Sequence, residues 1–176
     1  MNYDLLYENF NCADLNNLNK NFTNIIQKLG SPDCYINCSY PRTEDWESNS
    51  FKKIKFKSFR KNIDIHLNSY SWLANLTANY MKTNNITGSL IQLGSIYGLL
   101  GQDLTIYENT NMKENMTYSA IKGGIINLTR QMASYYGKYN IRINTLSPGG
   151  IKNSAVRSSK PQNKKFIKNY SKKNPL

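Results

Sequence analysis

The sequence predicts an α/β fold in which a doubly wound parallel sheet carries helices on both faces. Short apolar runs of strand length alternate with longer segments of helical periodicity, and turn-forming residues separate them. The chain has 176 residues, of which 39% are hydrophobic, which is enough for one domain with its own core. We therefore expect a single domain over residues 1–176.

Four segments are predicted to be strands: 10–13, 33–37, 89–93 and 141–146. Parallel strands need crossover connections, so the helical segments between these runs favour one parallel sheet. The last strand must end before Pro148, because proline has no N–H group to donate to a strand ladder.

Three segments have apolar residues at helical spacing: 15–29, 59–81 and 118–136. Gly30 and Gly137 follow the first and the third, and glycine is a common residue just after a helix. Segments 41–57 and 98–115 are polar, and we expect them to be irregular.

The chain is basic, with a formal net charge of +12. Its lysines are spread along the sequence without the aromatic–basic pattern of a nucleic-acid module, so we do not expect a nucleic-acid partner. From Lys152 to the end there are eight Lys or Arg residues and no acid. Segment 152–176 is either a mobile tail that attracts anions or one helix with a frayed terminus, and both interpretations stay open.

The three cysteines predict neither a disulfide framework nor a zinc site, because their number is odd and no CxxC pair occurs. Cys34 and Cys38 flank a predicted strand, where cysteine acts as a small apolar residue. A reducing, cytoplasmic setting fits this usage. The N-terminal residues include Asp4 and Glu8 and do not form a signal peptide, and no apolar run reaches membrane-spanning length, so no membrane partner is expected.

Tyr118 and Lys122 are a candidate catalytic pair. Four residues apart on a helix, they lie on one face. A phenol with a pKa of about 10 is a poor acid–base catalyst near neutral pH, but a nearby ammonium favours the phenolate and lowers that pKa. Such a tyrosine can exchange a proton with an alcohol or a carbonyl. The spacing alone is weak evidence, because an ordinary surface pair has it too.

Two turns place further groups at one edge of the sheet, where ligands of open α/β sheets bind. Ser95 lies directly after a predicted strand, at a place where its hydroxyl could hold a substrate oxygen. Segment 144–150 ends the next strand, and its glycines would let a flat ligand approach the backbone closely. Simple turn chemistry is the alternative for both.

Three motifs in this order resemble the short-chain dehydrogenase/reductase family: GSIYG at 94–98, YSAIKGGIINLTR at 118–130 and IRINTLSPGG at 141–150. The resemblance covers nearly the whole chain. It implies a partial Rossmann-like fold and an NAD(P)-dependent oxidoreductase that interconverts a secondary alcohol and a ketone, with NAD or NADP as cofactor and a small hydroxy or keto compound as substrate. Ser95 would polarise the substrate carbonyl, Tyr118 would transfer the proton and Lys122 would tune Tyr118.

The resemblance also assigns residues to the cofactor: Asp14, Asn37, Tyr118, Lys122, Pro148, Gly149 and Ile151. Asp14 would contact the adenine ring, Lys122 would bind the nicotinamide ribose, and residues 148–151 would line the nicotinamide. Asn37 matches the first residue of the family's Asn-Asn-Ala-Gly stretch.

The sequence departs from the family in two places. Asn37-Cys38-Ser39-Tyr40 replaces the Asn-Asn-Ala-Gly stretch, and His66 aligns with a helical asparagine of the catalytic tetrad. A neutral imidazole both donates and accepts, so His66 could relay protons. The alternative is a helix histidine that points at water or backbone. The loop at 101–108 resembles a subgroup found among bacterial surface-sugar and flagellin-glycan genes.

Nothing before Asp14 resembles the family's glycine-rich turn, which binds the cofactor pyrophosphate. We therefore expect the first strand–helix–strand unit to be absent and the dinucleotide to bind too weakly for this chain to be a competent dehydrogenase. An inactive truncated relative and a basic anion-binding module are the alternatives to an active oxidoreductase.

The resemblance also predicts a homo-oligomer. The helices at 59–81 and 117–136 would pair with their copies, and Trp72, Tyr135 and Tyr136 supply large aromatic groups that favour interfaces.

Overall fold

The computed structural model describes residues 5–152 and 162–173, and it contains a three-stranded parallel sheet. β1 (Cys34–Asn37), β2 (Ser89–Leu93) and β3 (Arg142–Leu146) lie in the order β1-β2-β3. Cys34 pairs with Ser89, which pairs with Arg142, so the strands begin at one level and end at one edge. The parallel α/β class and three of the four predicted strands are confirmed.

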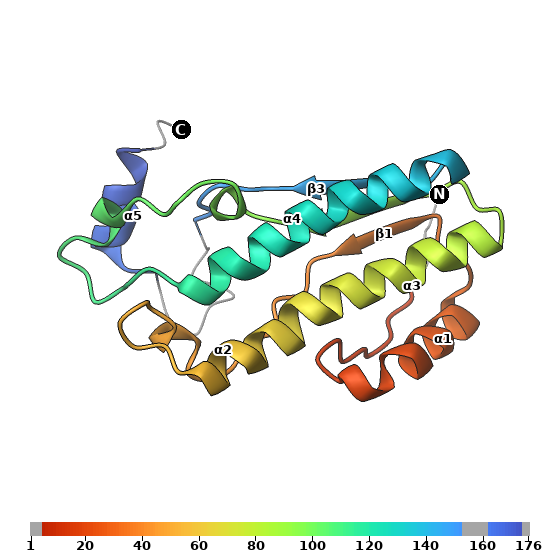
Figure 1. The fold of residues 1–176 in the computed structure, drawn as a ribbon, viewed down its shortest axis with the longest axis horizontal. Coiled ribbons are helices and arrows are strands. Elements are labelled where there is room, and N and C mark those ends of the chain that lie inside the picture. Colours follow the sequence, from red (N-terminus) through yellow and green to blue (C-terminus); the bar gives the residue numbers. More distant parts are fainter. Residues whose placement is uncertain (1–4, 153–161, 174–176) are drawn as a thin grey trace.

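The described residues form five α-helices: α1 (Leu18–Leu29), α2 (Phe56–Asn62), α3 (Ser69–Thr83), α4 (Met116–Tyr136) and α5 (Lys164–Ser171) (Figure 1). A π-helical segment, Ile63–Asn68, joins α2 to α3, so the helix predicted at 59–81 is one continuous helical segment. α1 stops at Gly30, whose φ of 88° is costly for any other residue. The three predicted helices are confirmed, with ends shifted by up to three residues.

The strand predicted at residues 10–13 is wrong, because Asn11 opens a turn there. Its side-chain oxygen accepts the Ala13 N–H (3.0 Å), and its backbone carbonyl accepts the Asp14 N–H (3.3 Å). A short strand needs a neighbour to take up its backbone groups, and β1 pairs with β2 alone in the described ranges. Without a ladder, the local side-chain bond prevails.

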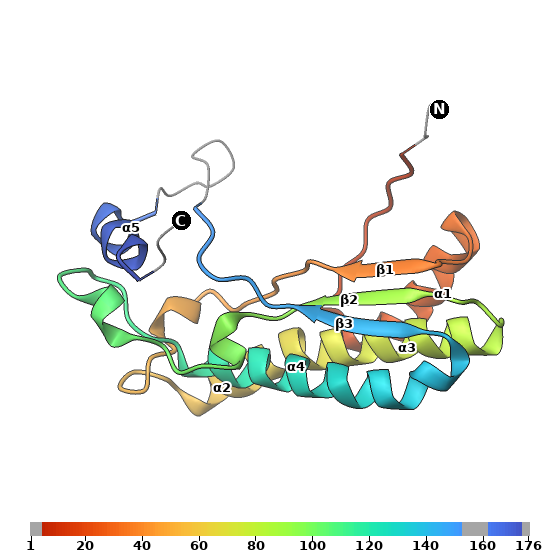
Figure 2. The same cartoon turned by 90° about the horizontal axis from the view of Figure 1, so that it is seen from above.

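Helices were predicted on both faces of the sheet, but in the part of the chain that is described they cover one. Figure 2 shows α3 and α4 along the same face, and α1 packs beside α3. The core under these helices consists of Ala74, Ala78, Met81, Leu90, Met132, Tyr136, Ile141 and Ile143. On the opposite face Ile36 and Leu146 stay 55% and 57% exposed. The strands accordingly alternate between buried and exposed residues, as expected when one face is open.

The basic C-terminal segment contains α5, which supports the interpretation as a helix rather than as a tail throughout. Lys173 forms an ion pair with Asp103 (3.1 Å), which ties this helix to the loop after β2. Residues 153–161 and 174–176 lie outside the described ranges, so the prediction of a mobile tail stays a prediction for these residues. No helix in the described ranges combines the length and the apolar character needed to cross a bilayer.

Two expectations about single residues are corrected. Cys34 and Cys38 are exposed rather than packed as small apolar groups, because β1 is an edge strand with an open face. Tyr136 does not point to an oligomer interface, because it is buried and its hydroxyl donates to Asn75 (3.2 Å) and Asn79 (2.9 Å).

Candidate active site

The carboxyl edge of the sheet gathers most of the predicted site residues. Asn37 ends β1, Ser95 lies two residues beyond β2, and Pro148 lies two residues beyond β3. The backbone N–H of Ile96 donates to the Pro148 carbonyl (3.1 Å), which joins the two turns. The strand ends therefore form one continuous rim on which side chains from three strands meet.

Helix α4 begins beside this rim and carries Tyr118 and Lys122. Asn115 caps it: its side-chain oxygen accepts the Tyr118 N–H (2.9 Å), and its amide donates to the Trp46 carbonyl (3.0 Å). Gly98 lets the turn after β2 lie directly on the helix, since a β-carbon there would be 2.6 Å from the Lys122 backbone carbon. The absence of a side chain at position 98 thus sets the distance between the turn and the helix.

Ser95, Tyr118 and Lys122 come together at this rim, as the sequence predicted. Ser95 is buried, and its side chain lies near enough to Tyr118 to act on the pKa of that phenol. The Lys122 Nζ atom lies 5.9 Å from the centre of the Tyr118 ring and donates to the Leu93 carbonyl (2.6 Å). The ammonium is thereby fixed under the end of β2. The catalytic roles of the three residues stay predictions.

Burial dominates the protonation of this pair. It raises the pKa of Tyr118, while the Ser95 side chain acts to lower it and Tyr170 acts to raise it. The sequence predicted a lowered pKa for this phenol, so the direction was wrong, because burial disfavours the charged phenolate. Burial also lowers the pKa of Lys122 to about 8. Tyr118 is therefore a neutral phenol near neutral pH and is suited to donate a proton.

Three aromatic rings lie around the Lys122 ammonium, and two more pack against them. We call these five rings the aromatic cage: Tyr40, Trp46, His66, Tyr70 and Tyr118. The Lys122 Nζ lies 5.8 Å from the ring centre of Tyr40 and 5.3 Å from that of Tyr70. The face of an aromatic ring attracts a cation, so the cage partly replaces the water that the ammonium loses.

His66 sits in the π-helical segment, fully buried, with its ring 5.2 Å from that of Tyr40 and 5.3 Å from that of Tyr70. Burial, followed by the charge of Lys122, lowers its pKa to about 3, while the backbone of Pro41 acts in the opposite direction. The imidazole is therefore neutral and does not point at water. Its role as a proton relay stays a prediction.

A buried polar network that the sequence did not reveal holds the start of α4. The Asn49 side-chain oxygen accepts the Thr117 hydroxyl (2.7 Å), and its amide donates to Ser58 (3.0 Å). The Asn49 carbonyl also accepts the Met116 N–H (2.9 Å). Segment 41–57, expected to be irregular, therefore fixes the residue next to Tyr118.

The residues that the resemblance assigns to the cofactor differ in their surroundings. Both Asp14 carboxylate oxygens accept from the Asn17 amide (3.1 and 2.9 Å), at the start of α1. The Asn37 side-chain oxygen accepts from Ser39, while its amide is buried without a partner among the described residues. Pro148 is half-buried, and Gly149 and Ile151 are exposed. Asn37 thus offers a buried, unpartnered donor at the end of β1, while residues 149–151 lie open to solvent beyond β3.

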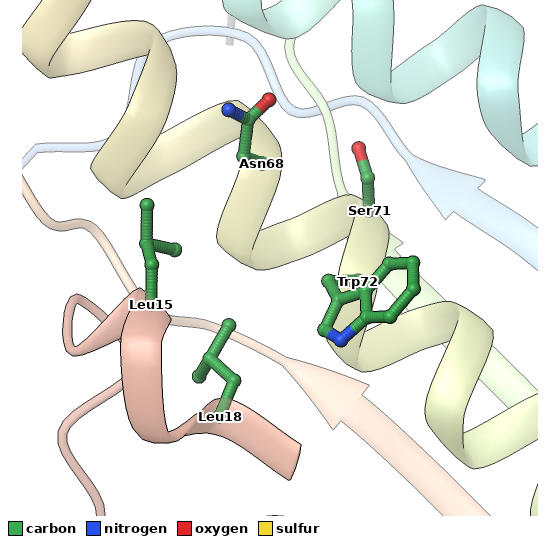
Figure 3. Close-up of a pocket in the computed structure, with 5 residues that line it drawn as sticks. All are labelled: Leu15, Leu18, Asn68, Ser71 and Trp72. Carbon is green, nitrogen blue, oxygen red and sulfur yellow. The ribbon is translucent and has the colours of Figure 1, made fainter.

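Two hollows on the surface of the described residues lie apart from Tyr118. One of them, of about 320 Å³, lies between the start of α1 and the junction of the π-helical segment with α3. Figure 3 shows the five residues that line it: Leu15, Leu18, Asn68, Ser71 and Trp72. A second hollow of about 370 Å³ lies between α4 and β3 and includes Thr145 and Ser147. Neither contains Ser95, Tyr118 or Lys122, so the candidate site is a rim rather than one of these hollows.

A family model described as "Enoyl-(Acyl carrier protein) reductase" matches residues 7–176. Post-translational flagellin modification protein A of Campylobacter coli is 30% identical over 144 residues, which cover 82% of this chain and 53% of the relative. The ribulose-forming D-arabinitol 2-dehydrogenase of Candida tropicalis is 40% identical over 75 residues, which cover 43% of this chain and 24% of the relative.

Solved structures agree. A short-chain dehydrogenase from Leptospira borgpetersenii with bound NAD+ superposes with a TM-score of 0.76 at 29% identity, over 95% of this chain and 59% of that one. 4-Hydroxyisoleucine dehydrogenase with NADH superposes with a TM-score of 0.68 at 28% identity, over 84% and 59% of the two chains. The chain spans at most about half the length of the curated relatives named above.

Proposed function

Because the chain belongs to the short-chain dehydrogenase/reductase family, we propose that it is an NAD(P)-dependent oxidoreductase that interconverts a secondary alcohol and a ketone. The observation that carries this proposal is the meeting of Tyr118 with Ser95 and Lys122 at the carboxyl edge of the sheet. The bound cofactor would supply or accept the hydride. We propose NAD or NADP for this role, held by the residues named above at the ends of the strands.

In the direction of ketone reduction, Tyr118 donates its phenolic proton to the substrate oxygen. Its raised pKa keeps that proton in place until the substrate oxygen becomes basic. Ser95 donates a hydrogen bond to the same oxygen and holds it beside the phenol. Lys122 stabilises the phenolate that remains, because its ammonium lies 5.9 Å from the ring centre.

For the substrate we propose a sugar or polyol, in a pathway that decorates bacterial surfaces. Two relatives support this proposal by their names: one is a flagellin modification protein, and flagellin lies at the bacterial surface, and the other oxidises the polyol D-arabinitol. The loop beside the rim is polar and aromatic, since Gln102 accepts from the Tyr107 hydroxyl (3.3 Å) and from the Asn115 N–H (3.2 Å). Such groups suit a ligand with several hydroxyls.

The test is a substrate panel with the purified chain at saturating dinucleotide concentration, because the sequence predicts weak dinucleotide binding. Arabinitol, other pentitols, fucose and a simple secondary alcohol are each incubated with NAD+ or NADP+, and formation of the reduced nicotinamide is followed by absorbance. We expect oxidation of at least one polyol or sugar. Oxidation of only the simple alcohol would contradict the substrate class, and no oxidation by a chain that binds the dinucleotide would contradict the activity.

We also propose a homo-oligomer in the cytoplasm. Trp72 and Tyr135 are 47% and 48% exposed on neighbouring helices, which suits a helix-to-helix interface, and the three cysteines are free. Sedimentation at high micromolar concentration tests the assembly, and a strictly monomeric mass would contradict it.

A further inference from the structure

The ammonium of Lys122 is closed off from solvent by rings. The side chain is only 3% exposed, although this lysine is expected to meet a ligand hydroxyl. Three rings lie within 6 Å of Nζ: Tyr40 at 5.8 Å, Tyr70 at 5.3 Å and Tyr118 at 5.9 Å. Movement of one of these rings would therefore open a way from solvent to the ammonium.

Two of the three rings are held in place. Tyr70 is buried, and its hydroxyl donates to the backbone carbonyls of Asn37, the last residue of β1 (3.0 Å), and of Ser39 (2.8 Å). Tyr118 sits on the capped first turn of α4 and interacts with Ser95. Moving either ring would break buried hydrogen bonds or the start of the helix.

Tyr40 differs from both. It lies in the loop after β1 and packs edge-on against Trp46, His66 and Tyr118, but at 42% exposed it is the most exposed of the three rings. The exposed guanidinium of Arg42 lies 5.5 Å from the same ring. Tyr40 therefore stands between a buried cation and a surface cation, and a ring turned outward would still have a cation beside it.

We propose that Tyr40 controls access to Lys122: its ring caps the ammonium, and a ligand hydroxyl reaches Nζ only after the ring has turned outward. For the function proposed above, Tyr40 is then a positioning residue that decides when the cofactor ribose meets Lys122. The capping itself does not depend on that function.

The experiment measures how fast the Lys122 amine reacts. The folded chain receives a short pulse of a small amine-acylating reagent at about pH 9, above the pKa of about 8. The peptide that carries Lys122 is then quantified by mass spectrometry. If the outward ring is populated at roughly 10% or less, as minor conformers usually are, Tyr40→Ala should react about tenfold faster or more than the unmodified chain.

Matched variants separate capping from general loosening. Tyr40→Phe keeps the ring and should react like the unmodified chain. Tyr135→Ala removes a ring of similar exposure that lies over Lys82 and Lys138 instead, and it should leave the Lys122 rate unchanged. Amide exchange in β2 must stay as slow in Tyr40→Ala as in the unmodified chain.

An unchanged Lys122 rate in Tyr40→Ala would overturn the proposal, and so would a Tyr40→Phe variant as fast as Tyr40→Ala. If Tyr40→Ala loses amide protection in β2, Tyr40→Trp provides the test instead. Its larger ring should make Lys122 react more slowly than in the unmodified chain, and an equal or faster rate would overturn the proposal. The readout needs no turnover, so a failure here is distinct from a failure of the oxidoreductase activity.

Discussion

Gly98 offers a direct test of how the site is assembled. A β-carbon at this position would lie 2.6 Å from the Lys122 backbone carbon, 2.7 Å from its carbonyl oxygen and 2.6 Å from Ile126 Cδ1. The side chain of Ile126 can rotate away, but the helix backbone cannot. Gly98→Ala must therefore lift the turn that carries Ser95 off α4.

Overpacking of this kind costs typically about 1–3 kcal/mol, against a total stability of roughly 5–15 kcal/mol for a domain. For a chain of this size the melting temperature should fall by about 2–4 °C per kcal/mol. Gly101→Ala is the matched control, because a β-carbon there meets no atom within 4 Å. Urea unfolding followed by circular dichroism measures both variants. Equal stability of Gly98→Ala and Gly101→Ala would refute the claim that the turn rests on the helix backbone.

Two further predictions concern stability. Tyr136→Phe removes the donor to Asn75 and Asn79 and should cost about 1 kcal/mol by urea unfolding, whereas Tyr135→Phe, on the exposed neighbouring ring, should cost much less; equal losses would contradict the inward placement of Tyr136. Lys122 has a pKa of about 8 when folded and 10.5 as a solvated lysine, so below about pH 8 both states are charged and the burial penalty is fully present. Between pH 8 and 10.5 the unfolded chain binds more protons at this lysine than the folded chain does. The free energy of unfolding should therefore rise with pH by roughly 3 kcal/mol relative to that of Lys122→Met. A difference between the two proteins that does not change with pH would count against the buried ammonium.

Local sequence patterns were enough to predict the strands and the helix that carry the candidate site. The alternation of apolar runs predicted β1, β2 and β3, and the four-residue spacing of Tyr118 and Lys122 predicted their common face. The convergence of Ser95 with them follows from strand direction, because parallel strands end at one edge. These are properties of short segments, which a sequence displays directly.

Features that depend on distant partners were missed. The segment at 10–13 resembles a strand, but whether it becomes one depends on a neighbour to pair with. The direction of the Tyr118 pKa shift depends on how much water the packed rings exclude. Tyr70 lies four residues after His66 on the same helix, so the spacing could have drawn attention to it, but its place over Lys122 is a contact between two helices.

The loop after β1 was the hardest part to predict. Tyr40 looked like a departure from a family pattern, and nothing local says that its ring reaches Lys122 on α4. Asn49 likewise belongs to a polar stretch that was expected to be irregular, yet in the structure its side chain hydrogen-bonds with both Ser58 and Thr117. Polar residues that form a buried network look in sequence like those of a solvated loop.

The measurement that tests the central claim most directly is the turnover of Tyr118→Phe with a substrate of the unmodified chain. The variant loses only the hydroxyl that is proposed to donate the proton, and Tyr107→Phe, which loses a hydroxyl bonded to Gln102 nearby, is the control. We expect Tyr118→Phe to lose about 10²-fold or more in turnover while calorimetry shows dinucleotide binding unchanged, and Tyr107→Phe to keep most of its activity. Full turnover by Tyr118→Phe would contradict the role of Tyr118 and, with it, the proposed chemistry of the site.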